Sequence, residues 1–246
     1  MPAMQPPPPT GTTIRSGSLS SSASTFLASS ALSVFFSDRL LEFVTAPVRL
    51  ETESLYFFTP VDAFTVKIKL ALLTGLLISS PVILGQFWLF VSPAMYGHEK
   101  KAVFPFVAVT SALFLAGAAF SFYKVVPVTL HFLLGMKTPW MKPILSVSEY
   151  LSFLTMMVSG FGLAFNLPVF ILIPVMLGVL NTRMMNQFHR QVIVLIFILA
   201  AVLTPGPDIA SQLLLAVPLV LLFELSLLAA FVAERMRKKK KAEVLG

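Results

Sequence analysis

Only a few side chains in this sequence could do chemistry, and three of them lie within apolar runs. Asn166, Gln212 and Glu224 are flanked mainly by Leu, Val, Phe and Ala. A charge at the centre of a bilayer costs on the order of 2.5–3.5 kcal/mol on insertion scales. We therefore expect Glu224 to lie near an interface, to be protonated or to be paired. Its role is then either a helix-to-helix hydrogen bond or a contact with a substrate or partner.

Asn166 stands in the longest apolar run of the chain, residues 150–180. Proline has no backbone N–H, so Pro168 and Pro174 leave the carbonyls four residues upstream, those of Ala164 and Phe170, without their helical donors. We predict that the Asn166 amide bonds to a carbonyl freed nearby. The run has 31 residues and would be about 46 Å long as one helix, which exceeds the ~30 Å hydrocarbon core. It must tilt, protrude or bend, and the residues that favour bending are Gly160, Gly162, Pro168 and Pro174.

The signatures of enzymes are missing from the sequence. It contains no HExxH, Walker or GxSxG motif and no cysteine, which excludes thiolate metal sites, disulfides and a cysteine nucleophile. The three histidines, His98, His131 and His189, are far apart, which favours loop or interface histidines over a metal site. We predict that the protein is not an enzyme and needs no cofactor.

Composition identifies the class of protein. The chain is 57% hydrophobic and 12% charged, with a mean hydropathy of +0.87, whereas soluble domains carry roughly 25% charged residues. Most of the surface must therefore face lipid. The net charge of +7 does not indicate a nucleic-acid partner, because the basic residues gather at the ends of apolar runs and in the tail 235–241, where they can meet anionic headgroups.

The order of apolar and polar segments predicts an all-α, polytopic membrane protein with one membrane domain, residues 25–234. Residues 1–24 are rich in Pro and Ser and are either disordered or a targeting segment, and residues 235–246 form a basic tail. Residues 37–63 are polar, acidic and broken by Pro47 and Pro60. The predicted spans are a short, serine-diluted run at 24–36, then 64–91, 102–123 with apolar character continuing to 134, 150–180, 192–204 and 209–232.

Lysines and arginines near the ends of these runs predict the orientation. If both termini are cytoplasmic, the inside segments carry eleven basic and three acidic residues, and the outside segments carry seven of each. An excess of Lys and Arg on the inside is typical of membrane proteins. We therefore expect both termini in the cytoplasm and an even number of spans, six when the weak first one is counted. Pro205 to Asp208 form a tight turn between the last two.

A further acid, Glu99, stands in a loop beside Lys100 and Lys101, where such a residue is ordinarily a solvated charge. Its surroundings suggest more. The run from Ser80 to Phe90, continuing through Pro93, Tyr96 and Glu99, resembles the second span and first cytoplasmic loop of the TatC family. Further matches follow in order over about residues 37–232: Phe122 to Pro127, Ser148 to Phe153, Phe161 to Phe165, Leu203 to Pro205, Pro207-Asp208, Ser211-Gln212, Ala216 to Leu219 and Phe223-Glu224.

The resemblance implies a six-span TatC-like bundle with both termini cytoplasmic and a concave face. It also implies the core receptor subunit of a twin-arginine translocase, which binds twin-arginine signal peptides and exports folded proteins with the proton-motive force, without a cofactor. The expected partners are TatA- and TatB-type single-span subunits, further copies of the chain and membrane lipids. The expected location is a bacterial cell inner membrane, or alternatively a plastid thylakoid membrane.

The resemblance also suggests roles for individual residues. Glu99 would pair with the signal peptide's arginines, because the arginine fork suits a carboxylate. The remaining roles are signal-peptide contact for Phe90, Pro93 and Tyr96, intramembrane polar or partner contact for Asn166, Gln212 and Glu224, and a periplasmic turn for Pro205 and Asp208.

The sequence departs from the family at two places. The family usually opens with a cytoplasmic segment of the type His-Leu-x-Glu-Leu-Arg, where this chain has Pro-rich and Ser-rich sequence. The family often has Glu, or sometimes Gln, where Asn166 stands, so an ion-pair role is lost there and a hydrogen-bonding role remains.

Two other functions are weighed against the translocase. A small secondary transporter could use Asn166, Gln212 and Glu224 as a midplane site, but the internal repeats common in transporters are not evident. A membrane-embedded hydrolase ranks last, because no acid–base pair or metal set is recognisable.

Overall fold

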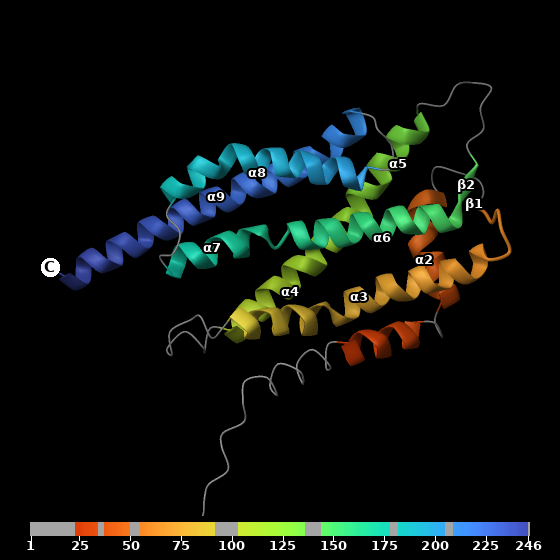
Figure 1. The fold of residues 1–246 in the computed structure, drawn as a ribbon, viewed down its shortest axis with the longest axis horizontal. Helices are drawn as coiled ribbons and strands as arrows, with labels where there is room; N and C mark the ends of the chain where they lie inside the picture. The colour runs from red at the N-terminus through yellow and green to blue at the C-terminus, as the bar shows by residue number, and fades with distance from the viewer. Residues whose placement is uncertain are drawn as a thin grey trace, which may run out of the picture. The chain divides into compact units, whose positions relative to one another are not determined.

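A computed structural model describes residues 23–33, 37–49, 55–91, 103–135, 144–177, 182–204 and 209–245 of the chain (Figure 1). Nearly all of these residues are helical. A helix at 23–33 comes first. The other elements are α2 (Ser37–Arg49), β1 (Leu55–Tyr56), α3 (Asp62–Val91), α4 (Val103–Phe120), η3 (Ser121–Val125), α5 (Val126–Gly135), β2 (Leu145–Ser146), α6 (Val147–Ala164), α7 (Leu167–Leu177), α8 (Thr182–Leu203) and α9 (Ile209–Leu245).

Within the described ranges, four helical segments are long and apolar enough to cross a membrane: Asp62–Trp88, Pro105–Gly135, Val147–Leu172 and Gln212–Met236. A shorter apolar segment, Gln187–Val202, lies within α8. The prediction of a polytopic α-helical membrane protein is confirmed. The only sheet in the described part of the chain is a parallel pair of two-residue strands, in which Leu55 faces Leu145 and Tyr56 faces Ser146.

One expected break, at Pro47, is absent. Residues 37–63 were expected to be broken at Pro47, but α2 continues through Pro47 to Arg49. Its buried residues, Ser37, Val44, Thr45, Pro47 and Val48, follow the helical period, so burial of one face outweighs the hydrogen bond that proline removes. Pro127 likewise lies inside a continuous helical segment. The π-helical turn η3 precedes it, and the Val126 N–H bonds to the Ser121 carbonyl, five residues back.

The chain divides into two compact units. The first unit comprises Met1–Leu41 and Leu70–Ser111, and the second comprises Glu42–Lys69 and Ala112–Gly246. The helices of the two units are joined by different kinds of contact.

In the first unit, the serine-rich helix 23–33 packs against α3 through its serines. Ser29 Oγ donates to the Gly75 carbonyl at 3.3 Å. Ser33 Oγ lies 3.5 Å from the Ala71 carbonyl and 2.8 Å from that of Ser30. A Cβ atom on Gly75 would clash with Ser30 Oγ. The serines that make this segment a weak span in the sequence thus allow a close helix-to-helix contact, as small residues do in membranes.

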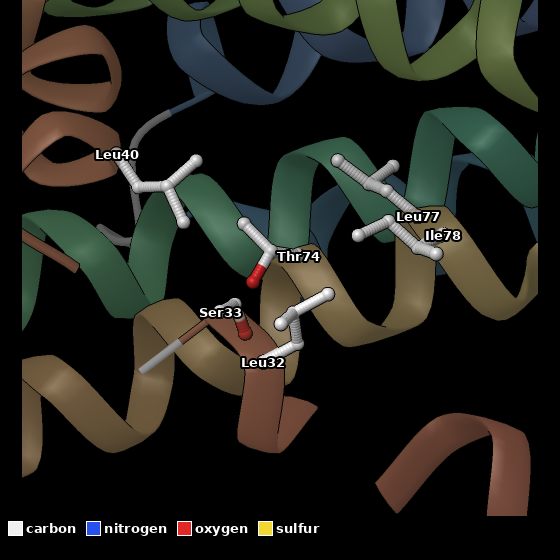
Figure 2. A pocket seen from close by; sticks show the side chains of 6 residues that line it. All are labelled: Leu32, Ser33, Leu40, Thr74, Leu77 and Ile78. Carbon is white, nitrogen blue, oxygen red and sulfur yellow. The ribbon is translucent and has the colours of Figure 1, made fainter. Parts of the chain in front are cut away.

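A cavity of about 320 Å³ lies beside this contact and is lined by Leu32, Ser33, Leu40, Thr74, Leu77 and Ile78 (Figure 2). The hydroxyls of Ser33 and Thr74 already donate to carbonyls of their own helices, those of Ser30 and Leu70, both at 2.8 Å. The cavity therefore offers an apolar surface.

The same unit joins the end of α3 to α4. Trp88 Nε1 donates to Thr110 Oγ1 at 3.2 Å, and the centroids of the Trp88 and Phe106 rings are 5.9 Å apart. Thr110 is fully buried and also donates to the Phe106 carbonyl. These contacts position the two helix ends that flank residues 92–102, the segment that carries Glu99.

In the second unit, α6 supplies the centre of the core. Leu151, Leu154, Met157 and Phe161 are completely buried. A Cβ on Gly117 of α4 would lie 2.6 Å from the Phe161 carbonyl, so the two backbones approach closely at this glycine.

Polar contacts tie together the end of this unit where α3 and α6 begin. Lys69 Nζ donates to the Ser148 carbonyl at 3.0 Å and to Ser148 Oγ at 2.7 Å, and the Tyr150 hydroxyl donates to the Val44 carbonyl at 2.7 Å. Together with the β1–β2 pair, these bonds fix where the two spans start.

Candidate functional site

The loop residues predicted as site residues lie outside the described part of the chain. These are Pro93, Tyr96 and Glu99, together with Pro205 and Asp208 of the predicted periplasmic turn. Phe90 belongs to the last turn of α3, but its side chain is also outside the described part. Their roles remain predictions. The three intramembrane polar residues are all described, and each makes a different contact.

Asn166 lies at the break between α6 and α7, which falls two residues before Pro168, one of the predicted bending points. Its side chain is completely buried, and its Nδ2 donates to the Gly162 carbonyl at 3.0 Å. The backbone N–H of Asn166 bonds instead to the Leu163 carbonyl at 3.0 Å. The side-chain amide of Asn166 therefore takes the place of its own backbone N–H as the hydrogen-bond donor to the Gly162 carbonyl. The Asn166 amide thus bonds to a carbonyl of its own segment, but that carbonyl belongs to Gly162 and is not one that proline deprives of its donor, so the predicted acceptor was wrong.

The main chain of Asn166 also begins the next helix. Its carbonyl accepts the N–H of Val169 at 3.0 Å and that of Phe170 at 3.1 Å. Asn166 Oδ1 is buried without a hydrogen-bond partner among the described residues. An unsatisfied buried acceptor is costly. In this arrangement Asn166 stabilises the break in its own chain segment, and its side chain is not exposed.

Gln212 links the hairpin of α8 and α9, which lie side by side (Figure 1). It stands in the first turn of α9, and its Nε2 donates to the carbonyl of Phe197 on α8 at 2.9 Å. The side chain is part-buried, so this bond crosses between the helices near their connecting turn.

Glu224 links the same two helices further from the turn. Glu224 Oε1 lies 2.7 Å from Nε2 of His189 on α8, and the side chains are 44% and 28% exposed. The centroids of the His189 and Phe223 rings are 5.5 Å apart. Of the three expectations for Glu224, the paired state is the one observed. The two links are twelve residues apart on α9, about 18 Å along the helix axis.

The sequence analysis missed His189 as a partner, although a signal was present. His189 precedes Thr204, the last residue of the predicted apolar run 192–204, by fifteen residues, and Glu224 follows Ile209, the first residue of the next predicted run, by fifteen. In an antiparallel helical hairpin, residues equally far from the turn lie at the same level. Counting outward from the turn would have paired the two.

A stripe of apolar residues on α9 passes beside Glu224. These residues are spaced mostly four apart, are each about half exposed, and are Leu213, Val217, Leu221, Leu225 and Leu228. Exposed apolar side chains on α8 include Phe188, Val194, Leu195, Ile198, Leu199 and Val202. The hairpin thus presents an apolar surface with a half-exposed carboxylate, and ionisable residues at such positions are commonly functional.

The polar groups of this unit do not form a catalytic or metal centre. Asn166 bonds within the α6–α7 segment, whereas Gln212 and Glu224 bond to different levels of α8. Among the described residues, no group of three or more His, Asp or Glu side chains could hold a metal ion. The arrangement holds helices together and exposes one carboxylate.

Comparisons with known proteins find similarity to one family over most of the chain. The model of a family described as Sec-independent protein translocase protein (TatC) matches residues 14–218. A translocase protein TatC of Aquifex aeolicus is 35% identical over 218 residues, which cover 87% of this chain and 90% of that relative. One of Helicobacter pylori J99 is 40% identical over 172 residues, covering 70% and 69%. A crystal structure described as the twin-arginine translocase receptor TatC superposes with a TM-score of 0.80 at 35% identity, covering 88% of this chain and 96% of that one.

Proposed function

Because this chain belongs to the TatC family of Sec-independent protein translocase proteins, we propose that it is the receptor subunit of a twin-arginine translocase. As a member of that family it is a membrane-embedded transport component and not an enzyme. In the proposed role it binds twin-arginine signal peptides of folded cargo and exports the cargo with the proton-motive force. The observation that carries the proposal is the agreement in fold, over most of the chain, with a protein described as that receptor.

Glu99 is the proposed recognition residue. A carboxylate can accept two parallel hydrogen bonds from one guanidinium, a geometry that lysine cannot match. The residue stands between α3 and α4, whose adjacent ends are joined through the Trp88–Thr110 hydrogen bond and the Phe106 ring. A fixed base for the segment limits the ordering cost of binding. Phe90, Pro93 and Tyr96 are proposed as its neighbours in the site.

The proposed topology has six spans with both termini in the cytoplasm of a bacterium, in its inner membrane. The count of six adds helix 23–33 and α8 to the four long spans. Helix 23–33 has eleven residues and is about 17 Å long, shorter than the ~30 Å core. Its serine contacts with α3 support its inclusion, since they satisfy hydroxyls that would otherwise meet lipid.

The hairpin of α8 and α9 is the proposed docking surface for TatA- and TatB-type single-span subunits. It combines exposed apolar stripes with the half-exposed Glu224, and Gln212 lies nearer the turn. Asn166 is less suited to this role, because its side chain is buried against Gly162 of its own chain. Its proposed part is to maintain the break between α6 and α7.

Export in living cells tests the proposal. The gene is expressed in a bacterium that lacks its own TatC but still makes its own TatA and TatB. Export of a folded twin-arginine reporter is then measured. We expect the wild-type chain to restore export and Glu99→Gln to abolish most of it. Glu149→Gln is the matched control, since Glu149 is an exposed acid in the first turn of α6. Export by Glu99→Gln at the level of this control would refute the assignment of Glu99.

A further inference from the structure

Several large apolar side chains of the second unit are exposed where α3 begins. They are between 50% and 67% exposed and comprise Tyr56, Phe57, Phe58, Val61 and Phe64, the aromatic patch. Four of the five are aromatic, and three of them are consecutive. Contiguous exposed apolar patches usually mark a surface that something covers.

The backbone that carries the patch is held at both ends. Tyr56 belongs to β1, which pairs with β2 through Leu55 with Leu145 and Tyr56 with Ser146 (Figure 1). On the other side, Asp62 Oδ2 accepts the backbone N–H groups of Phe58 at 2.8 Å and Thr59 at 3.0 Å. The rings are therefore presented from a fixed main chain, which lowers the ordering cost of any contact they make.

The length of the span places the patch relative to a bilayer. Asp62–Trp88 has 27 residues and is therefore about 40 Å long, against ~30 Å for the hydrocarbon core and ~40–45 Å with the headgroup regions. About 10 Å of helix is left over, so its ends reach the headgroup level. The start of α3 is one of those ends.

The direction of the patch follows the lipid-facing side of the same helix. Phe64, Ile68 and Leu72 are four residues apart, lie on one face of α3 and are all exposed. Ile68 and Leu72 stand deeper in the span, where exposed side chains meet lipid. Phe64 continues that face toward the helix start and therefore meets the bilayer at its surface.

A positive charge accompanies the patch. Lys67 is exposed and follows Phe64 by three residues, so it lies on a neighbouring part of the same helix face. Its long stem can lie along apolar surface while the ammonium reaches a phosphate. The nearby Asp62 carboxylate already accepts two backbone N–H groups. The charge beside the rings thus suits an anionic phospholipid headgroup.

We propose that the aromatic patch is an interfacial anchor that binds the phospholipid headgroup layer at the end of the bilayer where α3 begins. The rings of Tyr56, Phe57, Phe58 and Phe64 lie among the headgroups, and Lys67 meets the phosphates. Aromatic side chains are enriched at this depth because they join an apolar body to a polar or polarisable edge. The anchor sets the depth of α3 and, through β1–β2, the starting level of α6.

Site-directed spin labelling tests the anchor directly, because the chain has no cysteine of its own. Full-length variants Phe58→Cys and Phe64→Cys are labelled with a nitroxide in phospholipid vesicles. Collisions with oxygen, which prefers the membrane, are compared with those of a water-soluble nickel chelate. Leu72→Cys is the control within the membrane, and free cysteine carrying the same nitroxide, dissolved in the buffer, is the control in water. We expect both patch positions to give an oxygen-to-nickel ratio several-fold above that of the free label and below that of Leu72.

Two results would overturn the proposal. A ratio equal to that of the free label in buffer would place the rings in water. Low collision rates with both reagents would mean that protein, and not lipid, covers the patch, as in docking of a second copy. If either variant fails to insert, Phe57→Cys and Val61→Cys are judged by the same criteria. Because this test needs no signal peptide and no export, its outcome is separate from that of the proposed receptor function.

Discussion

The break between α6 and α7 and the hairpin of α8 and α9 both contain polar side chains in apolar surroundings, but they use them differently. At the break, Asn166 is completely buried and bonds to Gly162 four residues earlier in its own chain segment. In the hairpin, Gln212 and Glu224 are part-exposed and bond across to α8. The first arrangement shapes one helix. The second joins two helices and leaves a carboxylate accessible from outside.

The difference in burial has an energetic consequence. A buried donor or acceptor that loses its partner bears the full desolvation cost, whereas a part-exposed one can turn to water or headgroups. We therefore expect the break to respond strongly to small chemical changes and the hairpin to respond weakly. The following substitutions test this contrast, from the largest expected effect to the smallest.

Asn166→Asp should have the largest effect. The substitution keeps the shape, removes the Nδ2 donor and sets a carboxylate oxygen against the Gly162 carbonyl. An uncompensated buried charge costs about 3–5 kcal/mol. We expect the free energy of unfolding in detergent micelles to fall by about that amount. Asn166→Leu is the control, because it removes the donor without adding charge, and it should cost about 1–3 kcal/mol. Equal losses for the two variants would mean that the site is not dry.

Gly117→Ala should come next, since it affects the helix contact that supports the break. The new Cβ would lie 2.6 Å from the Phe161 carbonyl and 2.7 Å from the Phe165 ring. Overpacking of this kind costs about 1–3 kcal/mol. Thermal unfolding should show a lowered midpoint. Gly135→Ala is the matched control, because a Cβ there meets nothing within 4 Å. A midpoint for Gly117→Ala as high as that of the control would contradict the close approach of α4 and α6.

The His189–Glu224 pair should have the smallest effect. Measured couplings between polar side chains in membrane helices average about 0.6 kcal/mol and reach about 1.7 kcal/mol. A double-mutant cycle of His189→Ala, Glu224→Ala and the double variant should give a coupling energy in that range. A coupling above the loss for Asn166→Asp would reverse the contrast between the two regions. No measurable coupling would mean that the 2.7 Å contact contributes nothing to stability.

The sequence predicts the long spans well and the irregular positions poorly, for physical reasons. Runs such as 64–91 are apolar over more than the bilayer thickness, so composition alone identifies them, and α3 and α9 lie where expected. Pro47 was expected to break residues 37–63, because proline lacks an N–H. The burial that keeps α2 intact depends on tertiary neighbours, which the sequence does not reveal. Helix 23–33 looks weak because hydropathy counts its serines as polar, whereas Ser29 and Ser33 are directed at carbonyls of α3.

The polar residues follow the same rule. The bend before Pro168 could be predicted because a missing N–H is a local property. The identity of the acceptor could not, since it depends on whether the main chain of Asn166 tightens toward Leu163 and leaves Gly162 free. That Glu224 needs a partner could be predicted from its cost in lipid. The choice of His189 depends on the register of α8 against α9.

The most direct test of the receptor function is the binding of a signal peptide by the purified chain. A photoreactive twin-arginine peptide and its twin-lysine counterpart are cross-linked to the chain in lipid nanodiscs, with Glu99 intact or changed to Gln. We predict strong labelling of the wild type by the twin-arginine peptide, a several-fold loss with twin lysine and a comparable loss with Glu99→Gln. Equal labelling in all these combinations would contradict recognition of the arginine pair by Glu99.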